Sequence, residues 1–164
     1  MSDQTPSEQN PPEQVETIDF STLFSNARQT GNYDAVNELI PYAHFLGIRL
    51  DHDEDGTPLF VLPFDPKNIG NTHLPAIHGG VIAGFLENAA IMHLLYAMES
   101  STMPKPINCN IDYLRSGRPI ETYAKCEVTK QGRRIANVSI KAWQDNPDKL
   151  IASARYHFKV TPEA

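Results

Sequence analysis

The sequence predicts an α+β fold, an antiparallel sheet of about six strands curled around one long central helix. The first observation is an apolar run over residues 81–98, long enough for a buried helix. The second is a change of hydrophobic period from 3.6 to 2 after that run, which indicates four strands that each have one apolar face. Because a sheet of this kind must be covered and the helix is the only long apolar element, we expect the sheet to wrap around it.

Length and composition indicate a single domain. The chain has 164 residues, of which 40% are hydrophobic and 21% charged, enough to bury a core. We expect this domain over residues 19–164. Residues 1–18 are acidic and Pro-rich, which is typical of a disordered tail, and they lack the basic start and apolar core of a signal peptide. The two cysteines, Cys109 and Cys126, both fall in expected strands, which favours a reducing compartment and a cytoplasmic location.

Charge is unevenly distributed along the chain. The formal net charge is −6, which argues against a general nucleic-acid binder. Residues 1–100 hold 14 acids and 3 bases, whereas residues 101–164 hold 6 acids and 11 bases. This asymmetry favours an anionic partner for the second half, although an acidic tail accounts for part of it.

The remaining elements follow from local spacing and turn residues. Before the central helix we expect helices at 20–30 and 34–40, strands at 45–50 and 59–64, and an irregular stretch over 65–77. After it we expect strands at 107–113, 124–128, 136–142 and 150–160. Short links between these four strands predict an antiparallel meander with successive strands paired.

Two segments resemble a membrane span and a calcium-binding loop, but we expect neither. The run at 81–98 has the length of a membrane span, but Glu87, Asn88 and His93 interrupt it, and a charge at mid-span is costly. We therefore expect no membrane association. Residues 51–56 resemble the opening of a calcium loop, yet Leu62 stands where the bidentate Glu belongs. The histidines show no zinc pattern, so we expect no metal and no cofactor.

The segment His78-Gly79-Gly80 opens the central helix. Its first amides have no partner inside the helix and carry the positive end of the helix dipole. Glycines also let a ligand approach the backbone closely. Amides of Gly79 and Gly80 therefore form a candidate oxyanion hole; the alternative is that the glycines only permit a tight turn.

Glu87 is a carboxylate among apolar neighbours on the same helix. Burying it is costly unless it is hydrogen-bonded or performs chemistry, which makes it a candidate catalytic residue. The alternative is a solvent-facing position. On the helix face of Glu87 the neighbouring positions are mostly small or apolar, which favours the catalytic interpretation.

These features together resemble the hotdog-fold acyl-CoA thioesterases, in the PaaI-type and 4-hydroxybenzoyl-CoA thioesterase branches. His-Gly-Gly at the start of the central helix, an acid nine residues after the His, and the later IDYLRSGRP carry the resemblance, which spans residues 33–160. It implies a hotdog fold, dimers with shared sites, and an acyl-CoA substrate. The sequence departs from the family at Ser116, where Pro is usual, and at Thr72, which occupies the position of a common Asn, with Asn71 one residue further away.

Helix geometry independently favours two chains at each site. Gly79 and Glu87 lie eight residues apart, about 12 Å along the helix axis. One thioester carbon cannot contact both residues of one chain. We therefore expect a homodimer in which the two chains share each site, with a dimer of dimers as an open alternative.

Basic residues after the helix are candidates for binding the phosphates of coenzyme A, since arginine pairs with phosphate bidentately. The resemblance favours Arg115 and Arg133 for this role. Asn71, Ser116 and Gly117 complete the expected substrate-binding set. For each arginine taken singly, a solvated charged turn is the alternative.

The expected function is acyl-CoA thioester hydrolysis. Glu87 would act as general base or nucleophile, the helix-start amides as oxyanion hole, and His78 as the residue that orients the helix start or the substrate. The alternative is a non-catalytic hotdog protein that binds acyl-CoA or a related ligand. A hydratase would need a catalytic His with Asp or Asn, a pair that the sequence does not offer. The acyl group cannot be read from the sequence.

Overall fold

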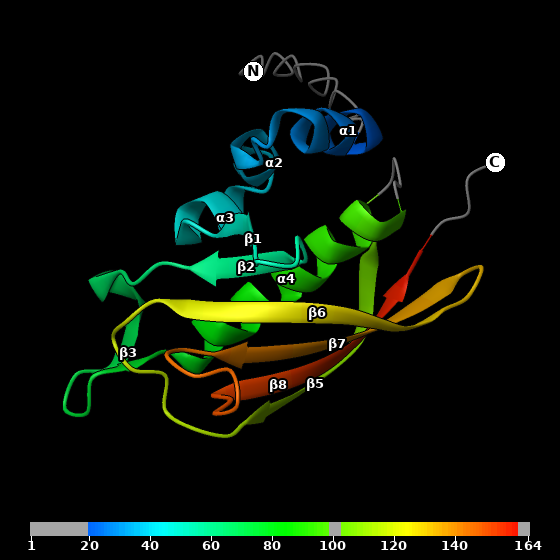
Figure 1. Ribbon diagram of the computed structural model, residues 1–164. Coiled ribbons are helices and arrows are strands. Elements are labelled where there is room, and N and C mark those ends of the chain that lie inside the picture. Colours follow the sequence, from blue (N-terminus) through cyan, green and yellow to red (C-terminus); the bar gives the residue numbers. More distant parts are fainter. Residues whose placement is uncertain (1–19, 99–102, 161–164) are drawn as a thin grey trace, which may run out of the picture.

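The computed structural model describes residues 20–98 and 103–160, so the expected tail at 1–18 lies outside the described residues. A six-stranded antiparallel sheet, in the order β1-β2-β6-β7-β8-β5, lies against the long helix α4 (Figure 1). The helices are α1 (Phe20–Thr30), α2 (Asp34–Glu38), α3 (Pro41–Leu46) and α4 (Gly79–Met98). The strands of the sheet are β1 (Arg49–His52), β2 (Pro58–Leu62), β5 (Lys105–Tyr113), β6 (Thr122–Gln131), β7 (Ile135–Trp143) and β8 (Ala152–Lys159). This is the α+β hotdog fold predicted from the sequence.

Helix α4 supplies much of the core. Its side chains Phe85, Leu86, Met92 and Leu95 are fully buried, and it contacts β2, β6, β7 and β8. Helices α1 and α3 also pack against α4, and Figure 1 shows the N-terminal helices next to the β1–β2 edge of the sheet. By length and composition α4 could cross a membrane, but half of its most apolar window is buried inside the protein, as expected of a core helix.

The first strand begins later than predicted, because an unpredicted helix precedes it. The sequence prediction placed a strand at 45–50, but α3 occupies residues 41–46 and β1 starts at Arg49. Pro41 takes a first-turn position of α3, where its missing N–H costs nothing. Gly47 then ends the helix with φ 68°, a left-handed conformation that glycine adopts without steric cost. Pro41 therefore begins a helix instead of only ending one.

The predicted four-strand meander is wrong in one respect. Only β6, β7 and β8 form a meander, while β5 pairs with β8, with Cys109 opposite Tyr156. The link over residues 114–121 carries the chain from one edge of the sheet back to its interior. Consequently β5 is an edge strand, and its residues Ile107 and Tyr113 remain more than half exposed.

The stretch expected to be irregular contains a small ribbon. After the 3₁₀ turn η1 (Pro66–Asn68), strands β3 (Ile69–Asn71) and β4 (Ala76–Ile77) pair antiparallel. The ribbon leads directly into α4, and the backbone N–H of His78 donates to the carbonyl of Asn68 at 2.8 Å. It therefore fixes the position from which the central helix starts.

The two cysteines differ in environment. Both are free thiols; Cys109 is exposed on the edge strand and Cys126 is buried. Burial raises the pKa of the Cys126 thiol, so this residue behaves as a small core hydrophobe.

Candidate functional site

The start of α4 is held by a dense set of hydrogen bonds around His78. Its carbonyl accepts the N–H groups of Val81 and Ile82 at 2.9 and 3.2 Å. Its imidazole Nδ1 accepts the N–H of Gly80 at 2.9 Å. His78 thus caps the helix in the position where Ser, Thr, Asp or Asn is usual.

This cap removes the Gly80 amide from the two expected oxyanion donors. The Gly80 amide already donates to His78, so it is not free to bind a ligand in this arrangement. The Gly79 amide, in contrast, donates to no group among the described residues. Because a first-turn amide with no partner is the natural anion site of a helix, the helix start offers one donor instead of two.

A glycine that the sequence analysis did not single out controls the position of His78. A Cβ at Gly70, on β3, would lie 2.7 Å from the His78 Cβ and 2.8 Å from its Cα. Only a residue without a side chain lets β3 pass this close to His78. The sequence signal was weak, since a lone glycine in an irregular stretch is most simply explained by a turn.

Glu87 lies on the exposed face of α4 that also carries Gly80, Ala83 and Gly84, none of which is buried. Its side chain is half-buried and accepts no hydrogen bond from any described residue. The Tyr156 hydroxyl, on β8, lies 3.4 Å from the carbonyl of Ala83, one turn before Glu87. Burial, followed by the negative charges of neighbouring groups that include Glu87, raises the pKa of Tyr156. Glu87 is therefore a carboxylate without a partner among the described residues, on the turn of α4 that follows the contact with Tyr156 in the middle of β8.

Gly79 and Glu87 occupy the same continuous helix, so the axial separation of about 12 Å holds in the folded chain. The structure brings His78, Gly79 and Gly80 together but leaves Glu87 two turns away. Within one chain these residues do not surround a single reacting atom.

A hollow of about 360 Å³ opens beside the helix start. Its walls come from β4, the first turns of α4, the end of β5 and the following loop: Ala76, Ile77, Gly79, Ile82, Tyr113, Leu114, Arg115, Ser116 and Gly117. The free Gly79 amide therefore belongs to a residue that lines a partly apolar hollow. Gly117 is itself buried, and a Cβ there would lie 3.2 Å from Ile82, so it serves close packing more than ligand contact.

A second hollow of about 370 Å³ adjoins the first and shares Arg115 and Ser116 with it. The remaining lining residues are Arg118, Gln144, Asp145, Asn146, Lys149 and Ile151. Its lining includes three basic side chains and one acid, Asp145. Arg118 forms an ion pair with this acid. Arg115 donates to the carbonyl of Leu150 at 2.6 Å, which holds its guanidinium at the rim. The substrate-binding residues expected from the sequence did not include Lys149. Its position in a polar turn gave no sign that it lines this hollow.

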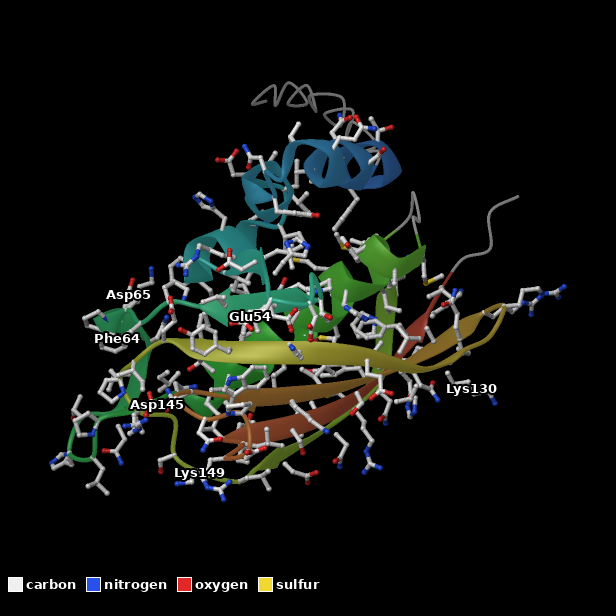
Figure 2. All side chains as sticks on the ribbon, viewed as in Figure 1. Glu54, Phe64, Asp65, Lys130, Asp145 and Lys149 are labelled. Carbon is white, nitrogen blue, oxygen red and sulfur yellow. The ribbon has the colours of Figure 1, made fainter. Side chains whose placement is uncertain are left out.

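Arg133 does not join Arg115 within one chain. The loop of Arg115 is hydrogen-bonded to Ile151, whereas the hairpin of Arg133 and Arg134 is hydrogen-bonded to Val160. Ile151 and Val160 are nine residue steps apart along an extended strand, a distance of about 30 Å. Figure 2 shows the same separation, with Lys130 near the hairpin and Asp145 and Lys149 at the opposite end of the sheet.

Asn71 has a local structural role. It is exposed, and its side-chain oxygen accepts the N–H groups of His73 and Leu74 at 3.0 and 3.3 Å, which stabilises the β3–β4 turn. Asn68 is the polar residue closer to the helix start. It is 4% exposed, bonds His78 through its backbone, and buries a side-chain Nδ2 with no partner among the described residues. The sequence analysis looked for an Asn about six residues before His78 and therefore did not single out Asn68. The turn at 72–75 adds residues between Asn68 and the helix start.

No group of three or more His, Cys, Asp or Glu that could hold a metal ion occurs among residues 20–98 and 103–160. The acidic run at 51–56 covers the end of β1 and the turn after it, in which Asp53 accepts the N–H groups of Asp55 and Thr57. Lys125 also pairs with Asp53. This pairing and the backbone hydrogen bonds lower the pKa of the Asp53 carboxyl.

Comparison with known proteins identifies related chains. A family model described as thioesterase superfamily matches residues 74–151. A Chromobacterium violaceum protein of known structure is 41% identical, with a TM-score of 0.71 over 85% of this chain and 97% of that chain. A Bacillus halodurans protein crystallised with CoA is 20% identical, with a TM-score of 0.69 over 89% and 93% of the two chains. A thioesterase from Haemophilus influenzae is 19% identical, with a TM-score of 0.67 over 78% and 89%. No curated protein matches this chain.

Proposed function

Since this chain belongs to the thioesterase superfamily, which supports thioesterase activity in general, we propose that it hydrolyses acyl-CoA thioesters. The observation that carries this proposal is the free Gly79 amide, at the positive end of α4 and on the wall of a hollow that continues into a basic one. An amide in this position stabilises the oxyanion that forms when a thioester carbonyl is attacked. The basic hollow offers a place for phosphates.

In the proposed reaction a bond forms between the water oxygen and the carbonyl carbon, and the carbon–sulfur bond breaks. Glu87 takes the proton of the attacking water and returns it to the departing thiolate, giving a free acid and coenzyme A. Direct attack by the Glu87 carboxylate, followed by hydrolysis of the resulting anhydride, is the alternative route. In both routes the Gly79 N–H binds the oxyanion, and His78 holds the helix start in place.

The coenzyme is proposed to lie along the two adjoining hollows. Arg115, Arg118 and Lys149 would face its phosphates, while the thioester would lie near Gly79. A structural neighbour crystallised with CoA supports this class of ligand. No cofactor is needed, since hydrolysis consumes only water.

We further propose that each site is completed by a second copy of the chain. The exposed face of α4 carries Glu87, and β5 beside it is an edge strand with exposed Ile107 and Tyr113. A two-fold dimer across this face would set the two α4 helices antiparallel. Glu87 of the partner subunit would then approach Gly79, and the partner subunit's Arg133 hairpin would approach the same end.

The second candidate function is binding of acyl-CoA without hydrolysis. Glu87 disfavours it, because partial burial of a carboxylate without a partner lowers stability, and a role in hydrolysis would explain why the residue is there. Both functions predict binding, so only turnover separates them.

The test is to assay the purified protein against acyl-CoAs of graded chain length and aromatic character, with release of free thiol as readout. We expect turnover of at least one substrate, and calorimetric binding of a non-hydrolysable acyl-CoA thioether. Binding without turnover across the panel would support the second function. If the protein neither bound nor hydrolysed any acyl-CoA, the proposal that its substrates are coenzyme A thioesters would be wrong.

A further inference from the structure

The peptide unit between Gly79 and Gly80 is held at both of its ends. Its carbonyl oxygen, on Gly79, accepts a hydrogen bond from the Tyr113 hydroxyl at 2.9 Å. Its N–H, on Gly80, donates to His78 Nδ1 at 2.9 Å. Two side chains, from β5 and from the residue before the helix, therefore help to hold this peptide plane at the start of α4.

The neighbouring peptide unit, between His78 and Gly79, is held at one end only. The His78 carbonyl accepts the N–H groups of Val81 and Ile82, whereas the Gly79 N–H has no acceptor within residues 20–98 and 103–160. Gly79 is the hinge between these two planes. Gly79 is the first residue of α4, and because it has no Cβ its backbone is less restricted than that of other residues, so outside contacts add to its rigidity. Because a peptide unit is planar, the bonds at the His78 carbonyl set the direction of the Gly79 N–H, and fixing the following plane limits rotation between the two planes about Gly79.

Tyr113 is well placed to restrict it. It is the last residue of β5 and pairs with Ala152 in β8, and the next N–H, from Leu114, bonds Ile151 at 2.8 Å. The backbone of Tyr113 is thus fixed by the sheet, even though its side chain is 54% exposed. A Cβ at Gly79 would lie 3.5 Å from the ring, which is ordinary contact. The hydroxyl links the rigid sheet edge to the helix start across 34 residues of sequence.

We propose that Tyr113 is a positioning residue, whose hydroxyl, acting with His78, orients the Gly79 N–H into the hollow that both residues line. The catalytic consequence of this role rests on the proposed function. Tyr113 acts through the Gly79 peptide and takes no proton from the substrate. Its ring also forms one wall of the hollow, so only removal of the hydroxyl separates orientation from ligand packing.

The decisive variant is Tyr113→Phe, which removes one oxygen and leaves the ring. Amide exchange and the chemical shifts of the Gly79 and Gly80 N–H groups, together with the His78 imidazole nitrogens, report the clamp by NMR. We expect about tenfold faster exchange of the Gly80 N–H and altered shifts for Gly79. For an acyl-CoA substrate we expect kcat to fall about 10- to 50-fold with KM within twofold, since a displaced oxyanion donor acts on the transition state.

The matched control is Tyr123→Phe on β6, which removes a hydroxyl that donates to Glu121 and is expected to leave the amide signals and kcat unchanged. Unchanged Gly79 and Gly80 signals in Tyr113→Phe would overturn the proposal, whatever the activity. A kcat equal to that of an active wild type would also overturn it. If the wild type hydrolyses no thioester, the proposed function fails, while the NMR result still decides whether Tyr113 orients the amide.

Discussion

His78 Nδ1 accepts the amide proton of Gly80 at 2.9 Å, so the imidazole of the His-Gly-Gly segment serves as a helix cap. A nitrogen that accepts a hydrogen bond carries no proton itself, which leaves Nε2 as the protonated nitrogen. His78 therefore contributes to the site by holding the backbone, and its position determines where the free Gly79 amide lies.

The first prediction concerns the contact that confines His78. In Gly70→Ala the new Cβ meets both the Cβ and the Cα of His78, so rotation of the side chain cannot relieve the clash. The helix start must shift, and a displacement of about 1 Å at a site costs about 10²-fold in rate. We expect kcat to fall by that order. The control is Leu74→Ala in the turn of the same ribbon, whose side chain is 75% exposed, and it is expected to stay within threefold. Normal turnover of Gly70→Ala would show that His78 tolerates displacement.

The second prediction concerns Glu87. Glu87→Gln keeps the volume of the side chain but provides neither a base nor a nucleophile, so we expect a folded protein with kcat lower by about 10²–10⁴-fold. Thermal unfolding should match the wild type. Glu127→Gln, at an exposed position on β6, is the control and should keep full activity. Turnover at the wild-type rate in Glu87→Gln would exclude this residue from the chemistry.

The third prediction concerns the basic side chains. Arg115→Ala and Arg133→Ala should raise KM for acyl-CoA more than they lower kcat, because they contact a part of the substrate remote from the thioester. Neither should affect an acyl-pantetheine thioester, which lacks the nucleotide. Arg49→Ala, whose guanidinium pairs with Glu121, is the control. Equal losses on both substrates would assign these arginines a structural role.

The fourth prediction tests the shared site. Glu87→Ala and Gly79→Val should each be inactive, the second because a branched side chain obstructs the helix start. If opposite subunits supply the two residues, a mixed dimer has one site with both lesions and one with neither. Co-refolding should then restore about half of the activity per heterodimer. Verified heterodimers that remain inactive would mean that each chain uses its own Gly79 and Glu87.

The fifth prediction concerns stability against pH. Burial of His93 lowers the pKa of its imidazole, and the buried Nδ1 has no partner among the described residues. The unfolded chain binds a proton near the ordinary pKa of about 6.5, so it binds more protons than the folded chain just below that pH. Stability should therefore fall as the pH drops below about 6.5, by at most about 1.4 kcal/mol per pH unit from this group.

Denaturant unfolding of wild type and His93→Gln between pH 7.5 and 5 measures this contribution. The difference in the free energy of unfolding between the two proteins should change with pH only below about 6.5. His157→Gln, at an exposed position on β8, is the control and should follow the wild type. Parallel curves for wild type and His93→Gln would show that His93 does not titrate differently in the folded state.

Local periodicity in the sequence predicted most of the fold. The apolar run that became α4 and the alternation in β6, β7 and β8 are properties of neighbouring residues, since side-chain direction repeats every 3.6 residues in a helix and every two in a strand. The separation of Gly79 and Glu87 followed from the same rule. Eight residues on one helix predicted that these two residues stay about 12 Å apart along the axis in one chain.

Only the tertiary structure decided how distant segments meet. β5 pairs with β8 instead of β6, because strand order depends on which edge a loop reaches and not on alternation within the strand. Tyr113 bonds Gly79 across 34 residues, and Gly70 packs on His78 across a turn whose length the sequence pattern did not reveal. The burial of Asn68 and the two adjoining hollows arise from such non-local contacts, which no local spacing encodes.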